Sequence, residues 1–214
     1  FLNVFGDIMS AYATPANVEM FLTSKPGNAG HTEDIANLAG KRLVVASEIE
    51  DNRRMSVSKI KQMTGGERVR ASHKYEREFE YEVTYKIWLN ANHKPEITDT
   101  TYSIWRRVKL IPFDVTIPKS EQDKRLKEKL SKEYPGILAW AVQGCVKWVQ
   151  LGLSEPLEVS QATDTYRVEQ DILAEFFKNC CHLEPNNAEC TVSHKDLFDG
   201  YQKWCATNLL VAAK

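Results

Sequence analysis

The feature that most constrains the fold is a short apolar run that ends abruptly in carboxylates. Residues 41–51 read Lys-Arg-Leu-Val-Val-Ala-Ser-Glu-Ile-Glu-Asp. An apolar run of this length is typical of a strand that is buried on both faces of a parallel sheet. The acids then lie at the carboxyl end of the strand, where open α/β sheets place their ligand sites. The run therefore predicts an α/β fold with an acidic site at one edge of the sheet.

Two further apolar runs predict the other strands of this sheet. Residues 86–89 are followed by the sequence Asn-Ala-Asn-His-Lys-Pro, and residues 108–113 come directly after Arg106 and Arg107. An acid, an amide and a pair of arginines, each beside a buried strand, are the side chains that a nucleotide-hydrolysing site needs. The pattern therefore predicts part of an ATP-driven motor.

A hairpin is expected between the first two buried strands. Residues 68–75 are basic, and residues 79–85 alternate aromatic or branched side chains with polar ones, which indicates a half-buried strand. Together these segments predict a hairpin with a cationic end. Glu67, Glu76 and Glu78 are available to pair with its cations, and the alternative interpretation is an exposed edge whose charges only prevent aggregation.

Helical periodicity covers much of the remaining chain. Ser193 and Asp196 have the spacing of a capping box and predict the start of a final helix. Trp140, Trp148 and Trp204 lie on helical faces and are expected in the core. The other expected helices are residues 1–10, 34–38, 56–63, 122–132, 137–151 and 160–179, and residues 190–192 are expected to form a short strand.

Composition sets limits on the partners and the compartment. The 214 residues suffice for one large domain or for a medium and a small one, and the net charge of -1 gives no overall sign of a nucleic-acid partner. No apolar stretch reaches membrane-spanning length. The 5 cysteines form no CxxC pair and fit no standard zinc finger, so reduced thiols in a cytosolic compartment are expected. Because the first residue is Phe1, we expect the chain to be a piece of a longer protein.

Four motifs resemble the phage and plasmid primase-helicases in their order and spacing. They are Gly-Lys-Arg-Leu-Val-Val-Ala-Ser-Glu at 40–48, Thr-Gly-Gly at 64–66, Asn-His-Lys-Pro at 92–95, and Ile-Trp-Arg-Arg with Ile-Pro-Phe at 104–113. These proteins are superfamily 3 helicases with an AAA+ core, related to the poxvirus primase-helicase. The resemblance implies an AAA+ parallel sheet flanked by helices, incomplete at its N-terminus, in residues 1–116. A helical segment in 117–153 and a winged-helix-like domain in 154–214 would follow.

The resemblance also implies roles for the polar residues of the expected sheet edge. Glu48 falls at the Walker B position, where an acid holds Mg²⁺ through water and helps to position the attacking water. Asn92 falls at the sensor position. Arg106 and Arg107 fall where an arginine finger reaches the γ-phosphate held by a neighbouring subunit. ATP and Mg²⁺ are the implied cofactors, and the implied assembly is a homo-oligomeric ring, a hexamer.

The sequence leaves open which acid binds the metal. The wider superfamily often has two adjacent acids, whereas here Ser47 precedes Glu48. Strand alternation favours Glu48, with Glu50 on the same side and Asp51 in the following turn. Glu50 and Asp51 are therefore expected to bind the cofactor. Taken without the motif order, an acid at the position of Glu48 is more often a solvated loop residue or a helix N-cap, and Asn92 is also compatible with a turn.

Single-stranded DNA is the partner that the resemblance implies. The basic segment matches the pore hairpin of the family, in which Arg68 and Arg70 add positive charge, His73 and Lys74 contact phosphates, and Tyr75 stacks on a base. The implied setting is DNA replication directed by a phage or plasmid gene in the cytoplasm of a bacterial host, without a membrane partner.

One departure from the family concerns the phosphate loop. A Gly-rich turn ending in Gly-Lys-Ser/Thr should lie immediately before Phe1 and is absent, and no Lys-Ser/Thr follows Gly27 or Gly30. That loop supplies the backbone N–H groups and the lysine that hold the β- and γ-phosphates. We therefore expect the 214-residue chain alone to bind ATP poorly and to hydrolyse none.

Two other functions are compatible with the sequence. The first is a non-catalytic replication-initiation module that binds DNA through the hairpin and the winged helix, in which case the longer protein lacks Gly-Lys-Ser/Thr. The second takes Glu48, Glu50 and Asp51 as a nuclease cluster, which predicts Mg²⁺-dependent DNA cleavage without nucleotide.

Overall fold

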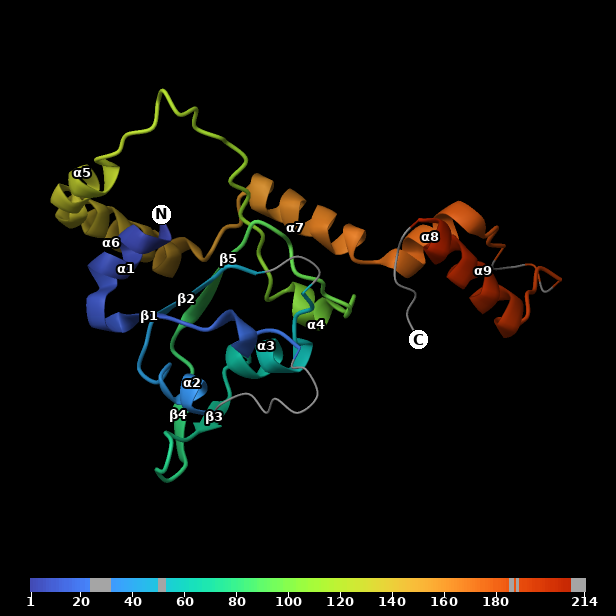
Figure 1. Cartoon of the computed structure of the whole chain (residues 1–214), viewed down its shortest axis with the longest axis horizontal. Coiled ribbons are helices and arrows are strands. Elements are labelled where there is room, and N and C mark those ends of the chain that lie inside the picture. Colours follow the sequence, from blue (N-terminus) through green and yellow to red (C-terminus); the bar gives the residue numbers. More distant parts are fainter. Residues whose placement is uncertain (24–31, 50–52, 185–186, 188, 209–214) are drawn as a thin grey trace. The chain divides into compact units, whose positions relative to one another are not determined.

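Two of the three apolar runs form neighbouring strands of one parallel sheet (Figure 1). In the computed structural model, β2 (Leu43–Ser47) lies between β1 (Ala13–Pro15) and β5 (Lys86–Asn90). Val44 pairs with Ile87 of β5 and is completely buried. The α/β class and the two strands are therefore confirmed, and β2 is buried because apolar side chains cover both of its faces.

The structure describes residues 1–23, 32–49, 53–184, 187 and 189–208. The chain divides into two compact units, residues 1–167 and residues 168–214. The Gly- and Pro-containing segment 24–31, in which the sequence predicts a loop, lies outside the described residues, as do Glu50 and Asp51.

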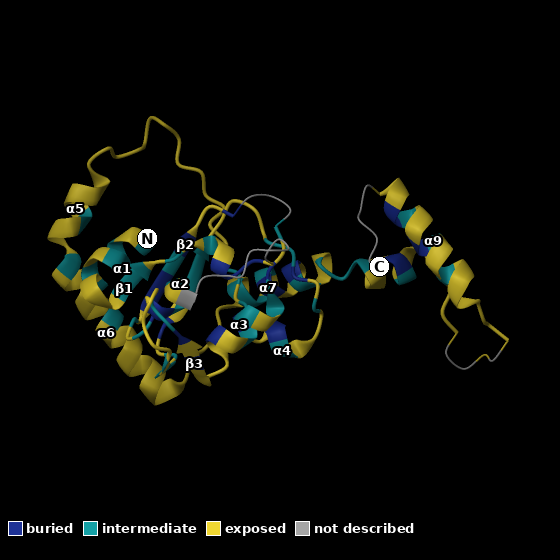
Figure 2. Cartoon of the chain, turned by 60° about the horizontal axis from the view of Figure 1, so that its bottom comes forward, coloured by how far each residue is buried: buried dark blue, intermediate teal, exposed yellow. Residues whose placement is uncertain are grey.

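Helices and turns pack around the sheet to form one hydrophobic core, drawn in dark blue in Figure 2. The helices expected near residues 1–10, 34–38 and 56–63 are confirmed with small shifts of their ends. They are α1 (Leu2–Met9), α2 (Thr32–Ala36) and α3 (Val57–Thr64), and they are joined by α4 (Tyr102–Trp105) and by the short 3-10 helices η1 (Ser10–Tyr12) and η2 (Val18–Met20). The core cluster consists of Met20, Phe21, Leu38, Val44, Ala46, Met55, Ile60, Met63, Tyr85, Ile97, Ile104, Trp105 and Tyr166.

The expected hairpin forms a separate two-stranded antiparallel sheet, which extends away from the parallel sheet in Figure 1. Its strands are β3 (Arg68–Ala71) and β4 (Phe79–Glu82), so the second strand ends three residues earlier than predicted. Gly65 and Gly66 lead from α3 into β3. A Cβ atom on Gly65 would lie 2.8 Å from the carbonyl oxygen of Lys61, and Gly66 has a φ of +80°. This turn therefore requires glycine at both positions.

The expected third buried strand is wrong. Residues 108–113 form no strand, and the side chain of Phe113 is 74% exposed. The backbone N–H of Leu110 donates a hydrogen bond to Oγ1 of Thr163, 3.0 Å away on the helix α7 (Leu157–Glu169). The backbone of residues 108–113 therefore bonds, at Leu110, to a side chain of α7 and not to a neighbouring strand. Pro112 has no N–H with which to extend a ladder.

Two helices follow near the expected ranges 122–132 and 137–151, the first starting four residues later and the second three residues earlier than predicted. They are α5 (Leu126–Lys132) and α6 (Tyr134–Leu151), and Pro135 is well placed in the first turn of α6. The prediction that Trp140 and Trp148 lie in the core is wrong, because they are 65% and 53% exposed. The helix α6 packs mainly against the short helices α1 and α5, which are too small to cover its apolar side chains (yellow in Figure 2).

The single helix expected at residues 160–179 is two helices, α7 and α8 (Ile172–Cys180). Asp171 causes the break, because its side chain accepts a hydrogen bond from the backbone N–H of Ala174 and so caps the start of α8. A capping residue of this kind favours a new helix start over continuation of the preceding helix.

The second unit contains α8 and α9 (His194–Thr207). The side chain of Ser193 accepts the backbone N–H of Asp196, which confirms the predicted helix start. Phe176, Tyr201 and Cys205 form a small core with Trp204 packed against it, so Trp204 does contribute to a core. Residues 190–192 do not form the expected strand.

The described residues from 154 onward form helices and no strand, and the winged-helix-like domain stays a prediction. None of the helices in the described ranges combines the length and the apolar character needed to cross a bilayer.

We predict that acid stability depends on an ion pair between α3 and the segment that precedes α4. Lys61 Nζ lies 2.8 Å from Oδ2 of Asp99, and Oδ1 of Asp99 accepts the backbone N–H of Thr101. Hydrogen bonding to Lys61 and Thr101 lowers the pKa of Asp99 to about 2. Because the folded pKa lies below the unfolded one, the contribution is complete above about pH 4 and is lost as the pH falls toward about 2.

Asp99→Asn should therefore lower the free energy of unfolding by about 1 kcal/mol at neutral pH. The difference from the parent chain should shrink as the pH approaches about 3. Urea unfolding across this range measures both effects. Asp164→Asn is the control, because Asp164 is exposed and has no ion pair among the described residues. An equal loss for Asp99→Asn at both ends of the range would contradict the prediction.

Candidate functional site

The carboxyl ends of β2 and β5 meet at one edge of the parallel sheet. Because the strands pair in register, Ser47 lies opposite Asn90. The backbone N–H of Glu48 donates a hydrogen bond to the carbonyl oxygen of Asn90, with N and O 3.2 Å apart. Asn92 follows two residues later and is exposed. The structure therefore brings together the acid and the amide-bearing segment that the sequence analysis selected.

Asn90 is a site residue that the sequence analysis did not select. It contacts Glu48 directly through its backbone, whereas Asn92 has no described hydrogen bond to Glu48. A signal was present, because Asn90 comes directly after the apolar run of β5, just as the acidic segment follows that of β2. The family resemblance favoured Asn92, and both amides belong to the candidate site.

The backbone of Glu48 is in an unusual conformation. Its φ is +68°, in the left-handed region that residues other than glycine adopt at a cost of about 1 kcal/mol. The strand β2 ends at Ser47, so the alternation that predicted Glu48 and Glu50 on one side does not extend to Glu48. The Glu48 side chain is exposed at the sheet edge. Residues in such conformations occur frequently at functional sites.

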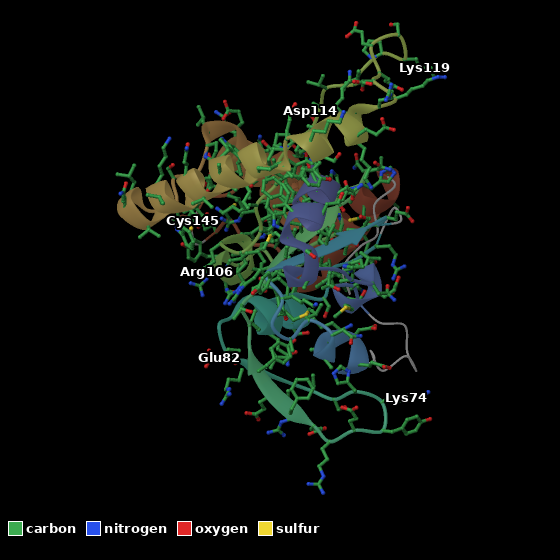
Figure 3. The ribbon with its side chains drawn as sticks, turned by 90° about the vertical axis from the view of Figure 1, so that its left-hand side faces the viewer. Lys74, Glu82, Arg106, Asp114, Lys119 and Cys145 are labelled. Atoms are coloured by element: carbon green, nitrogen blue, oxygen red, sulfur yellow. The ribbon has the colours of Figure 1, made fainter. Side chains whose placement is uncertain are left out.

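The two arginines follow the helix α4 and not a strand. Arg107 is half-buried; its Nη1 donates to the carbonyl oxygen of Ser103, and its Nε is buried without a hydrogen-bond partner in the described part of the chain. Arg106 is exposed at the surface (Figure 3). Its guanidinium has no hydrogen-bond or ion-pair partner among the described residues. Arg107 is therefore bound within its own chain, whereas Arg106 is available to an external anion.

The predicted site residues that the structure describes fall into three separate places on the chain. Glu48 and the segment from Asn90 to Asn92 meet at the sheet edge, the arginines follow α4, and the hairpin residues lie on β3 and on the connection that follows it. Among the described residues, no hydrogen bond or ion pair joins Glu48 to Arg106, to Arg107 or to the hairpin. The geometry therefore supports one candidate site at the sheet edge. The arginines after α4 and the hairpin form two separate surfaces.

The arginines on the hairpin strand face glutamates on the other strand. Arg70 pairs with Glu80 at 2.9 Å, and Arg68 lies opposite Glu82 in the register. The hydrogen bond from Arg70 lowers the pKa of Glu80 below its usual range and raises that of Arg70. The expectation of a cationic hairpin therefore needs a correction, because an acid neutralises Arg70 within the hairpin itself.

The tip of the hairpin presents an aromatic ring and an ammonium group together. Tyr75 is 95% exposed and has a φ of +67°, and Lys74 Nζ lies 5.2 Å from the centre of its ring. His73 stacks on Phe79, with ring centres 5.7 Å apart. Figure 3 shows Lys74 at this extremity. A ring and a cation side by side on a projecting turn suit contact with a base and its phosphate.

The oxygen donors of the sheet edge fit a nucleotide-bound Mg²⁺ in their chemistry. Proteins commonly hold Mg²⁺ through one or two carboxylates together with waters and substrate phosphates. Glu48 supplies an exposed carboxylate, and Asn90 and Asn92 supply amide groups from the neighbouring strand. Within the described ranges, no group of three or more His, Cys, Asp or Glu residues is arranged to hold a metal ion by itself.

Comparison with known proteins finds a family model that matches the part of the chain carrying these residues. A family of unknown function, DUF5906, matches residues 2–107. This match covers Glu48, the hairpin, Asn92, Arg106 and Arg107.

Two viral proteins are similar over nearly the whole chain. "Putative helicase L207/L206" of Acanthamoeba polyphaga mimivirus is 23% identical over 211 residues, which cover 91% of this chain and 22% of that protein. "Putative helicase 022R" of Frog virus 3 (isolate Goorha) is 23% identical over 224 residues, which cover 96% of this chain and 23% of that protein. The chain thus spans less than a quarter of either relative. Both come from viruses of eukaryotes, whereas the motifs resemble phage and plasmid proteins.

We predict that the strain at Glu48 can be relieved by glycine. Glu48→Gly should raise the free energy of unfolding by up to about 1 kcal/mol, because glycine adopts a positive φ without steric cost. Glu48→Gln keeps the side-chain length and should leave the stability unchanged. Thermal unfolding of the two variants beside the parent chain measures the difference. A Glu48→Gly variant less stable than Glu48→Gln would show that the backbone is not strained there.

Proposed function

We propose that this chain is part of an ATP-dependent DNA helicase of the superfamily 3, AAA+ type. The observation that carries the proposal is the meeting of Glu48 with the segment from Asn90 to Asn92 at the carboxyl edge of a parallel sheet. Open α/β sheets bind ligands at such an edge. The similarity to two viral proteins named as helicases supports the same function.

The proposed reaction is hydrolysis of the γ-phosphate of ATP. Glu48 orients a water and accepts its proton while the water oxygen bonds to the γ-phosphorus and the bond to the β-phosphate oxygen breaks. The amide of Asn92 or Asn90 holds the water or a γ-phosphate oxygen in place. Mg²⁺, when bound with ATP, supplies positive charge to the phosphates. Glu50 and Asp51 lie outside the described residues, and their binding of the cofactor is part of the proposal.

Arg106 is the arginine that we assign to a neighbouring subunit's γ-phosphate. It is exposed and its guanidinium is unpartnered among the described residues, whereas Arg107 donates to Ser103 on its own helix. A guanidinium already bound within its own subunit is poorly placed to reach another. We therefore propose a ring of identical subunits, a hexamer, in which Arg106 stabilises transition-state charge across each interface and Arg107 holds the end of α4.

The hairpin is the proposed contact with single-stranded DNA. Tyr75 stacks on a base and Lys74 contacts a phosphate, since both are exposed at the tip. Arg68, Arg70 and His73 contribute less, because Arg70 is paired with Glu80 and His73 is stacked on Phe79. The proposal places DNA binding mainly in the turn and not in the strands.

The phosphate loop, the winged-helix-like domain and the primase of the complete enzyme are also proposals. The phosphate loop would come from sequence that precedes Phe1 in a longer protein, which the length of the two relatives allows. The winged-helix-like domain at 154–214 and an attached primase would complete a replicative enzyme that acts on a viral, phage or plasmid genome in the cytoplasm of its host.

The trans role of Arg106 predicts a complementation result in the longer, loop-containing protein. Glu48→Gln and Arg106→Ala should each lower DNA-stimulated ATP turnover by about 10³-fold or more. Mixing the two inactive variants should restore about a quarter of the parent activity, because some interfaces then combine an intact Glu48 with an intact Arg106. Arg42→Ala, another exposed arginine, is the control and should stay active.

Failure of the mixture to regain activity would contradict the trans role of Arg106. Full activity of the Glu48→Gln variant alone would contradict the hydrolytic role of the sheet edge. The 214-residue chain without the loop should show no turnover in the same assay.

Binding of DNA can be tested on the chain as it stands. By fluorescence anisotropy with a labelled oligonucleotide, Tyr75→Ala should weaken binding about tenfold. Lys74→Ala should reduce the salt dependence of the logarithm of affinity by about 0.7. Tyr102→Ala and Lys147→Ala are matched controls, because both residues are exposed and lie away from the hairpin. Equal effects of the hairpin and control variants would contradict the assignment.

The second candidate is the non-catalytic DNA-binding module, which the exposed hairpin tip favours. This module would show the same losses on Tyr75→Ala and Lys74→Ala. It differs in that the longer protein would lack Gly-Lys-Ser/Thr and would hydrolyse no ATP, so the two assays together separate the candidates.

A further inference from the structure

One buried tyrosine contacts the segment that carries the candidate sensor amide. Tyr166 on α7 is 3% exposed, and its hydroxyl donates to the carbonyl oxygen of Pro95. The Nζ atom of Lys94 lies 5.5 Å from the centre of the same ring. Lys94 and Pro95 complete the Asn-His-Lys-Pro motif that begins at Asn92. Both the polar and the aromatic parts of Tyr166 therefore hold the chain immediately after Asn92.

The same ring also contacts the helix that leads to the arginines. Trp105 packs edge-on against Tyr166, with ring centres 5.2 Å apart and planes at 86°. Trp105 is 4% exposed, and its indole N–H donates to the carbonyl oxygen of Asp99 at 2.9 Å. Since Arg106 is the next residue, the orientation of Trp105 constrains where Arg106 leaves the surface.

Further hydrogen bonds attach α7 to this region on both sides of α4. Thr163 Oγ1 accepts the N–H of Leu110 at 3.0 Å, and Arg167 Nη2 donates to the carbonyl oxygen of Thr100 at 3.0 Å. The helix α7 thus binds the chain before and after α4. Tyr166 lies between these contacts. It joins the segment that follows Asn92 to the helix α4.

We propose that Tyr166 is a positioning residue, which sets the placement of Asn92 relative to Arg106. This inference rests on the proposed function. Tyr166 touches no reacting group, and acts through Pro95 and Trp105. Loss of its hydroxyl frees the carbonyl of Pro95 while the ring contact with Trp105 is kept. The effect falls on the placement of groups that stabilise the transition state, and small misplacements of such groups lower turnover strongly.

The test is Tyr166→Phe in the longer, loop-containing protein. The kcat for DNA-stimulated ATP hydrolysis should fall about tenfold or more, while the KM for ATP and the affinity for single-stranded DNA stay unchanged. Tyr201→Phe is the matched control, because Tyr201 is also buried, at 4% exposed, but belongs to the second unit. It should leave kcat unchanged.

A second readout uses the 214-residue chain and is independent of ATP hydrolysis. In a chain labelled with ¹⁵N, the indole resonance of Trp105 should shift on Tyr166→Phe and stay in place on Tyr201→Phe. An unmoved Trp105 resonance would overturn the proposed coupling between Tyr166 and α4. If Tyr166→Phe does not fold, the kcat of Trp105→Phe in the longer protein tests the same coupling, because this variant keeps an aromatic ring beside Tyr166 and removes the indole bond to the carbonyl oxygen of Asp99.

The outcomes separate this inference from the proposed function. Unchanged kcat in Tyr166→Phe, with Glu48→Gln and Arg106→Ala inactive, would overturn the positioning role and leave the helicase proposal standing. Full activity of Glu48→Gln and Arg106→Ala would overturn the helicase proposal itself. A fall in kcat matched by equal losses of thermal stability and DNA affinity would mark Tyr166 as a general stability residue and overturn its positioning role.

Discussion

The pairing of β2 with β5 is the constraint on which the rest of the first unit depends. Its parallel register sets where both strands end, and so places Glu48 beside Asn90. Parallel neighbours cannot be joined by a tight turn, because the chain must return to the other end of the sheet. The connection here contains α3 and the β3–β4 hairpin. The candidate DNA contact is therefore built into the crossover that the sheet requires.

Apolar packing around Trp105 and Tyr166 also holds the segments of the candidate site in place. Trp105 and Tyr166 belong to the same buried cluster as Val44 of the central strand. Burial of Trp105 leaves its neighbour Arg106 at the surface, since successive residues on a helix point in different directions. The ion pair of Lys61 with Asp99 adds a polar connection from α3 to the start of α4. Apolar packing and a few polar bonds thus hold the functional segments around one core.

Local patterns in the sequence were sufficient for the elements whose structure is determined locally. The strands β2 and β5, the helix α3 and the Ser193 cap were predicted because apolar runs, helical periodicity and capping residues act within a few positions. The strand β1 was missed, because three residues are too short to show a pattern. Residues 108–113 read as a strand, but a strand needs a partner, and the backbone N–H of Leu110 bonds to Thr163 on α7 instead.

The sequence by itself determined that an acid, an amide segment and two arginines accompany the strands and helices of an α/β fold. Only the tertiary structure decided that Asn90 contacts Glu48, that Arg106 is exposed while Arg107 is held by Ser103, and that Arg70 is neutralised by Glu80. It alone showed that Tyr166 contacts both Pro95, which follows Asn92, and Trp105 of α4. The physical reason is that residue type and spacing act over a few positions, whereas these contacts join residues that the fold brings together.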